Sequence, residues 1–156
     1  MIFSVPGILT WVITMNSNQE MLSSILKTTQ MGQVGIRCVM HESMGPKLRG
    51  ALRSQLQEYD KIEQEAHAIA GSNGWTLPEL PQSTKIMSTM MGRMKMRFGN
   101  SDSKIADMMI QGNTKGMVTS LKDQHRLSSS DERVCALSQK LLECESANIQ
   151  QMTPFL

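Results

Sequence analysis

A chain of 156 residues is long enough to bury one hydrophobic core without disulfides or a structural metal. Aromatic residues make up only 4% of the chain while methionine contributes 15 residues, so aliphatic and methionine side chains must fill that core, which favours helices over sheets. The formal net charge of +2 is too small to attract a polyanion over a distance, and no nucleic-acid partner is expected.

The first fourteen residues are apolar. A secretory signal carries Lys or Arg before its hydrophobic run, and this segment carries neither. The run is also too short to span a bilayer. We expect residues 1–14 to be an extension ahead of the true start at Met15, and residues 15–156 to form a single helical-bundle domain. The alternative is an apolar arm that packs on the bundle or touches lipid; otherwise membrane contact is not expected.

Apolar residues that recur every three or four positions predict four long helices, at 18–41, 46–70, 102–125 and 130–152. The first is expected to begin after a polar cap near Asn18, and the second to end at Gly71. A connection rich in proline and glycine separates the second helix from the third, and Trp75 and Leu77 are expected to pin it to the bundle. A short helix is expected at 83–98.

Glycines inside the helices predict close helix crossings. Gly32 and Gly35 lie in the first helix, and Gly112 and Gly116 lie four residues apart in the third. Each costs about 1 kcal/mol relative to alanine in a helix. We therefore expect a neighbouring helix to pack closely against each glycine, where no side chain stands in the way.

Three cysteines, Cys38, Cys135 and Cys144, lie within apolar helical patterns. Their odd number and wide spacing disfavour a disulfide framework, and none stands beside a histidine that could activate a thiol. We expect all three to be buried and unreactive, in a protein of the reducing cytoplasm.

A helical hairpin, a long connection with a short helix, and a second hairpin follow one another as in ferritin-like bundles. The most specific likeness is the segment Asp102-Ser103-Lys104-Ile105-Ala106-Asp107-Met108-Met109-Ile110-Gln111-Gly112-Asn113, where a glycine follows two acids. With this segment, and in its layout from Met21 to Met152, the chain resembles the ferritin-like superfamily, and within it small uncharacterised bacterial members. The resemblance implies an all-α fold, a four-helix ferritin-like bundle with a short crossover helix between the second and third long helices.

The resemblance also implies a di-iron site, built from a Glu on each of two helices and a Glu-x-x-His pair on each of the other two. This chain has no such pair. Gln64 stands where an acid would precede His67, and Asn148 stands where a histidine would follow Glu145. Neutral amides are poor ligands for iron or manganese, so we expect a degenerate site without a cofactor, with bound iron or manganese as the alternative.

Seven polar residues on the helices are candidates for either a buried polar layer or a residual metal site: Gln33, Glu63, His67, Gln111, Asn113, Glu145 and Asn148. In a polar layer, each amide donates and accepts hydrogen bonds across the core and so fixes the register of the helices. Glu63 and His67 are four residues apart and can also pair on the surface of one helix.

The short helix at 83–98 is rich in methionine and basic residues. A basic amphipathic helix of this kind can bind a protein partner or mediate self-association. The alternatives are a Cu(I) site of thioethers, and an ordinary solvated helix that packs its methionines on the core.

No motif of a common catalytic class occurs in the chain: no nucleotide-binding glycine loop, nucleophile elbow or His-Glu-x-x-His. We therefore expect a non-catalytic structural or protein-interaction module, and enzymatic activity is not expected. The alternative function is metal binding.

Overall fold

The structure, a computed structural model, describes the backbone from residue 6 and the side chains from residue 17, with gaps at 81–84, 86–87, 90–91 and 93–100. The described part folds into four long helices without a strand: α1 (Pro6–Val39), α2 (Pro46–Asn73), α4 (Asp102–Arg126) and α5 (Glu132–Met152). A 3₁₀ turn, η1 (Thr153–Phe155), follows α5. The expected all-α four-helix bundle is confirmed.

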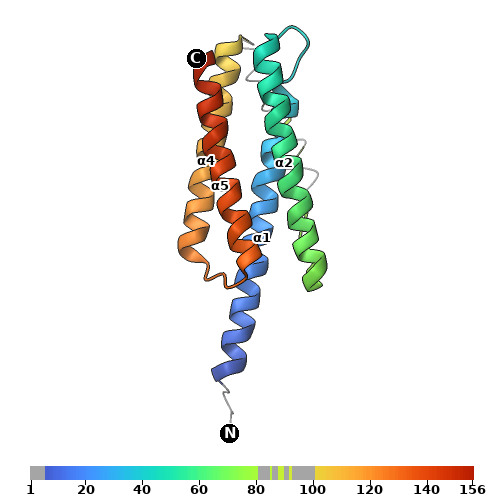
Figure 1. Cartoon of the computed structure of the whole chain (residues 1–156), viewed down its shortest axis with the longest axis vertical. Helices are drawn as coiled ribbons and strands as arrows, with labels where there is room; N and C mark the ends of the chain where they lie inside the picture. The colour runs from blue at the N-terminus through green and yellow to red at the C-terminus, as the bar shows by residue number, and fades with distance from the viewer. Residues whose placement is uncertain (1–5, 81–84, 86–87, 90–91, 93–100) are drawn as a thin grey trace.

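The directions of the helices define the wiring of the bundle. α2 runs opposite to α1, α4 runs in the same direction as α2, and α5 returns beside α4 (Figure 1). Because α2 and α4 run the same way, the connection between them must return over the length of the bundle. One long crossover of this kind is compatible with a ferritin-like fold. The short helix expected at 83–98 lies mostly outside the described residues.

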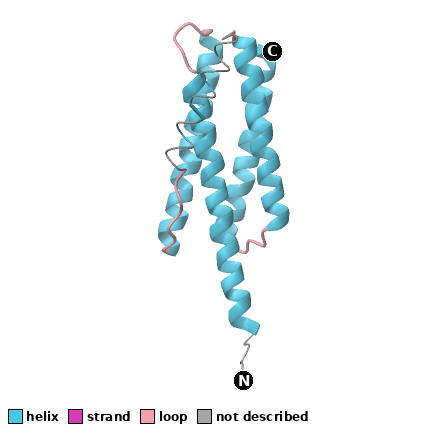
Figure 2. Cartoon of the chain, turned by 180° about the vertical axis from the view of Figure 1, so that it is seen from behind, coloured by secondary structure: helices cyan, strands magenta, loops and turns pink. Residues whose placement is uncertain are grey.

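α1 begins at Pro6 and not near residue 18, as the sequence had suggested. Proline suits the first turn of a helix because that turn needs no backbone N–H donor. The helix then passes through the polar stretch at 15–20 without a break, and its first turns project beyond the other helices (Figures 1 and 2). Within the described ranges, no helix is both long enough and apolar enough to cross a membrane.

Asn18 caps a neighbouring connection and not its own helix. Its Oδ1 accepts hydrogen bonds from Ser129 Oγ at 2.5 Å and from the backbone N–H groups of Ser130 and Asp131 at 3.0 and 3.2 Å. These contacts join residues more than 100 positions apart in the chain. They fix the α4–α5 connection against α1.

The ends of the other helices follow from their capping residues. Pro46 lies in the first turn of α2, and Gly74 ends that helix with a left-handed backbone at φ 66°. Ser101 accepts a hydrogen bond from the N–H of Lys104 at the start of α4, and Asp131 accepts from two N–H groups at the start of α5. The predicted boundaries of these three helices are confirmed to within three residues.

The core lies along the axis of the bundle and receives side chains from all four helices. Trp75 and Leu77, on the connection after α2, pack against it as expected. The buried apolar residues that lose nearly all of their exposed surface include Leu22, Leu26, Ile36, Leu48, Leu52, Ile62, Ile105, Val134 and Leu137. Tyr59 on α2 is the one tyrosine of the chain and is buried with them, so its hydroxyl group lies in this core.

Candidate functional site

A buried hydrogen-bond network joins three helices at the middle of the bundle. Tyr59 Oη on α2 donates to Asn113 Oδ1 on α4 at 3.0 Å. Asn148 Nδ2 on α5 donates to the same Asn113 oxygen at 3.1 Å and approaches Tyr59 Oη at 3.3 Å. Asn113 Nδ2 in turn donates to the carbonyl oxygen of Met109 at 2.7 Å. The structure therefore brings Asn113 and Asn148 together as a polar layer.

Glu145 lies beside this network, one turn before Asn148 on α5. Its side chain is only 2% exposed, and its Oε2 atom has no hydrogen-bond partner among the described residues. Burial raises the pKa of Glu145 to about 8, and the hydroxyl of Tyr59 offsets only part of this effect. Glu145 is therefore protonated near neutral pH and can both donate and accept a hydrogen bond.

Two glycines make room for this site. A Cβ at Gly116 on α4 would lie 2.7 Å from Glu145 Oε1, and a Cβ at Gly32 on α1 would lie 2.5 Å from the ring of Tyr59. The expected close approach at these two glycines is confirmed. At Gly112 and Gly35 the expectation is wrong for the part of the chain that the structure describes, because a Cβ there would meet none of its atoms within 4 Å. These two glycines face open space.

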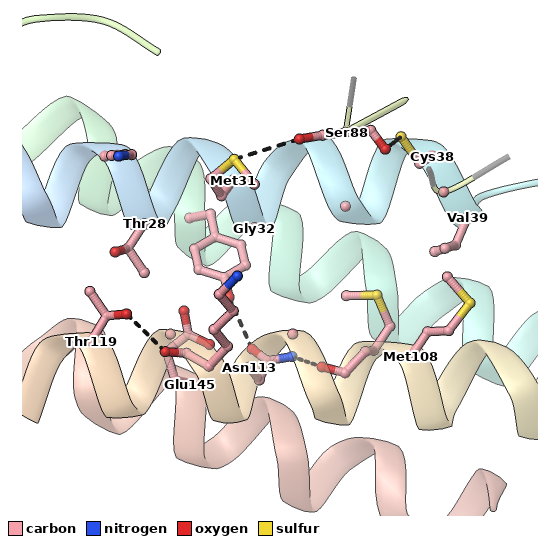
Figure 3. A pocket seen from close by; sticks show the side chains of 18 of the residues that line it. Thr28, Met31, Gly32, Cys38, Val39, Ser88, Met108, Asn113, Thr119 and Glu145 are labelled. Atoms are coloured by element: carbon pink, nitrogen blue, oxygen red, sulfur yellow. Dashed lines mark hydrogen bonds between the residues drawn. The ribbon is translucent and has the colours of Figure 1, made fainter. Parts of the chain in front are cut away.

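That open space is a pocket of about 570 Å³ between α1 and α4. Gly35 and Gly112 line it, while Tyr59 and Glu145 are the residues that α2 and α5 contribute to its lining in the described part of the chain. Figure 3 shows Glu145 and Asn113 across the space from Met31 and Gly32 of α1. Buried polar groups thus form the floor of the pocket, and a ligand would reach them between α1 and α4.

One end of the pocket is closed by a contact between α1 and α4. Ser24 Oγ donates a hydrogen bond to Asp123 Oδ2, and Arg126 pairs with Asp123 Oδ1 at 3.2 Å. Farther along the pocket, Ser88 and Gly92 belong to the segment between α2 and α4, and the Ser88 hydroxyl approaches the sulfur of Met31 (Figure 3).

Gln33 and Glu63 lie in a second, separate cluster between α1 and α2. Gln33 Nε2 donates to Glu63 Oε2 at 2.6 Å and to Asp60 Oδ1 at 2.8 Å. Gln30 Nε2 donates to Glu63 Oε1 at 3.2 Å, and Gln30 Oε1 accepts from the N–H of Leu80 at 3.0 Å. This cluster ties the connection after α2 to the first hairpin.

The pKa of Glu63 falls below its ordinary value although burial acts to raise it. The hydrogen bonds from Gln33 and Gln30, with the nearby charges of His67 and Arg37, outweigh burial. His67 itself is exposed, with Nε2 at 3.8 Å from Glu63 Oε1, so the two form a loose pair on the helix surface.

Two expectations from the sequence are wrong. Gln111 is exposed and only contacts Asp107 one turn earlier in α4, at 3.1 Å, because the helix turns its side chain away from the bundle. Cys135 is also exposed, while Cys38 and Cys144 are half-buried. Burial raises the pKa of Cys144 to about 11, so that thiol stays protonated.

The donor set at the core does not fit iron or manganese. Hard cations bind several anionic oxygens, whereas the network beside Glu145 is built from the neutral side chains of Tyr59, Asn113 and Asn148. In the described ranges, no three His, Cys, Asp or Glu side chains gather closely enough to hold a metal ion.

Several residues of these clusters are not among the candidates predicted from the sequence. They are Tyr59, which fits the apolar periodicity of α2, and Gln30, Asp60 and Asp123. The signal for Gln30 was its spacing of three residues from Gln33 on one helix face.

Comparison of the chain with models of protein families, with curated proteins and with solved structures gives no match.

Proposed function

We propose that this chain is a non-catalytic helical bundle that acts by binding, and that the pocket between α1 and α4 is its binding site. The observation that supports this most directly is the unpaired Oε2 of Glu145 on the floor of a pocket of about 570 Å³. An unpaired buried polar group costs about 1–3 kcal/mol, and a ligand that pairs with it removes this cost. The pocket volume is also in the usual range for small ligands.

Membership of the ferritin-like superfamily is part of the proposal. It is supported by the single long crossover between parallel α2 and α4. Amides at 113 and 148, where the resemblance would place metal ligands, support a member that binds without metal chemistry. Binding of iron or manganese, the alternative expected from the sequence, gains no support from the donor set.

A protein partner or self-association through the segment 83–98 stays a prediction. Most of that segment lies outside the described residues. The binding role proposed for the pocket is separate from this protein-interaction role, which was expected from the sequence.

The experiment uses a neutral fluorescent probe, N-phenyl-1-naphthylamine, whose emission rises in an apolar site. Gly112→Leu places a side chain into the open space of the pocket, so we expect it to abolish the rise in emission. Gly50→Leu is the matched control, because Gly50 also faces open space but lies outside the pocket lining. Equal probe binding by the wild type and by Gly112→Leu would show that the pocket is not the binding site.

A further inference from the structure

The walls of the pocket are mostly apolar. Met31 and Val39 line it from α1, and Met108 lines it from α4 (Figure 3). Met109 of α4 is also part of the lining. Methionine side chains adapt to the shape of an occupant because they are unbranched and flexible. Most of the surface of a well-matched ligand is therefore apolar.

The floor of the pocket offers one polar anchor. Tyr59 and Asn113 use their hydrogen-bonding groups on each other and on the Met109 carbonyl. Among the described side chains, Glu145 Oε2 is the buried polar atom of the pocket lining that has no partner. A ligand gains most by placing its polar group against this carboxyl.

The charges around the pocket disfavour a cation. Exposed Lys27 and Lys115 line it, whereas Asp123 is already engaged by Ser24 and Arg126. Glu145 has no cationic partner among the described residues, and burial raises its pKa to about 8. At neutral pH its carboxyl group presents an O–H donor beside a carbonyl acceptor.

We propose that the pocket binds a neutral, largely apolar small molecule that ends in an amide, with the amide paired to the carboxyl group of Glu145. The acid O–H donates to the amide carbonyl, and the amide N–H can donate back to a carboxyl oxygen. A charged ligand, whether an ammonium or a carboxylate, would lose its hydration beside a buried carboxyl group that carries no charge to pair with it. This inference rests on the proposed binding function of the pocket.

Three probes of nearly the same shape separate the ligand classes: benzamide is neutral, benzamidine is a cation and benzoate is an anion. Each is titrated into the full chain at several pH values and followed by NMR chemical shifts. We expect benzamide to bind most tightly at about pH 6. Above a pH of about 8 its affinity should fall, by at most about tenfold per pH unit, because Glu145 loses the proton that it donates.

Variants of Glu145 provide a second test of this proposal. Glu145→Gln keeps a donor and an acceptor, so benzamide should still bind but without the pH dependence. Glu145→Leu removes both groups and should weaken benzamide by about tenfold, as expected for the loss of a hydrogen bond. Circular dichroism of each variant establishes that the helices are intact.

The outcomes separate this inference from the proposed function. If benzamidine or benzoate binds more tightly than benzamide, or if none of the three binds, the amide class is wrong. Benzamidine binding that strengthens with pH and disappears in Glu145→Gln would identify a cation site instead. If Gly112→Leu fails to block the naphthylamine probe, the pocket itself is wrong and both proposals fail.

Discussion

The carboxyl group of Glu145 on α5 occupies the space that a side chain at position 116 on α4 would need. A Cβ built at Gly116 would lie 2.7 Å from Glu145 Oε1 and 2.8 Å from its carboxyl carbon. The glycine and the buried acid are therefore coupled. The position of the acid on the pocket floor depends on the absence of a side chain opposite.

We expect Gly116→Ala to destabilise the protein. Its methyl group would overlap the Glu145 carboxyl, and such overpacking typically costs about 1–3 kcal/mol. Better helix propensity returns about 1 kcal/mol, so the net loss of stability is about 0–2 kcal/mol. Urea unfolding of the wild type and of the variant measures the change.

Gly112→Ala is the matched control, one turn earlier on the same helix. It gains the same propensity, about 1 kcal/mol, and its methyl group enters open space. We therefore expect it to stabilise the protein. Equal effects of the two substitutions would show that Glu145 does not lie against Gly116.

Glu145→Gln should change the pH dependence of stability. The pKa of Glu145 is about 8 in the folded protein, against an ordinary value of 4.5. Between these values the folded protein holds a proton that the unfolded chain releases. The free energy of unfolding of the wild type therefore falls as pH rises, by at most about 1.4 kcal/mol per pH unit, and this fall ends above pH 8.

Glutamine does not titrate, so Glu145→Gln should lack this contribution. The two proteins should be similar near pH 4.5, and the variant should become the more stable one as pH rises to 8. Urea unfolding at several pH values gives the difference. Glu143→Gln, an exposed acid on the same helix, should run parallel to the wild type. A Glu145→Gln curve parallel to the wild type would contradict the raised pKa.

The sequence predicted the four helices because their apolar periodicity and most of their capping residues are local signals. It placed Asn18 at a helix start because asparagine prefers that position, whereas Asn18 caps a connection more than 100 residues away. The capping preference of asparagine predicts that its side chain accepts hydrogen bonds, but it does not predict which N–H groups donate them. That information is contained only in the packing of α1 against the α4–α5 connection.

The candidate site was predicted in part for a similar reason. Asn113 and Asn148 meet in the core, but Gln111, two residues from Asn113, faces solvent. A helix rotates by about 100° per residue, so two positions separated by two residues lie on opposite faces. Periodicity alone also could not separate Gly112, which faces the pocket, from Gly116, which faces Glu145.

Added metal should leave the stability unchanged. A ligand that binds only the folded state raises the melting temperature as its concentration rises. The neutral groups around Glu145 do not offer a metal ion such a binding site. Melting curves with chelator, with Fe²⁺ and with Mn²⁺ should coincide. A rise that is specific to one metal and disappears in Glu145→Gln would establish a metal site.

Gln30→Ala should loosen the connection after α2. The substitution leaves the buried N–H of Leu80 and one oxygen of Glu63 without their partner, at a cost of about 1–3 kcal/mol. The pKa of Glu63 should also rise, because a hydrogen bond that favours its charged form is lost. Urea unfolding and an NMR titration of the carboxyl measure the two effects. Gln111→Ala, an exposed glutamine in α4, should show neither effect.

Asn18→Ala should destabilise the contact between α1 and the α4–α5 connection. The Asn18 oxygen accepts from the N–H groups of Ser130 and Asp131, which lie at the turn before α5 and have no helical partner there. Loss of a capping residue costs about 0.5–2 kcal/mol. Because Asn18 lies far from this connection in the sequence, no local contact compensates for its loss. Hydrogen exchange should quicken at residues 130 and 131, and urea unfolding should shift to lower concentration. Gln19→Ala, whose side chain makes an exposed contact with the Thr76 carbonyl, is the control and should change neither measurement. Unchanged exchange at 130 and 131 in Asn18→Ala would show that the connection is held by other contacts.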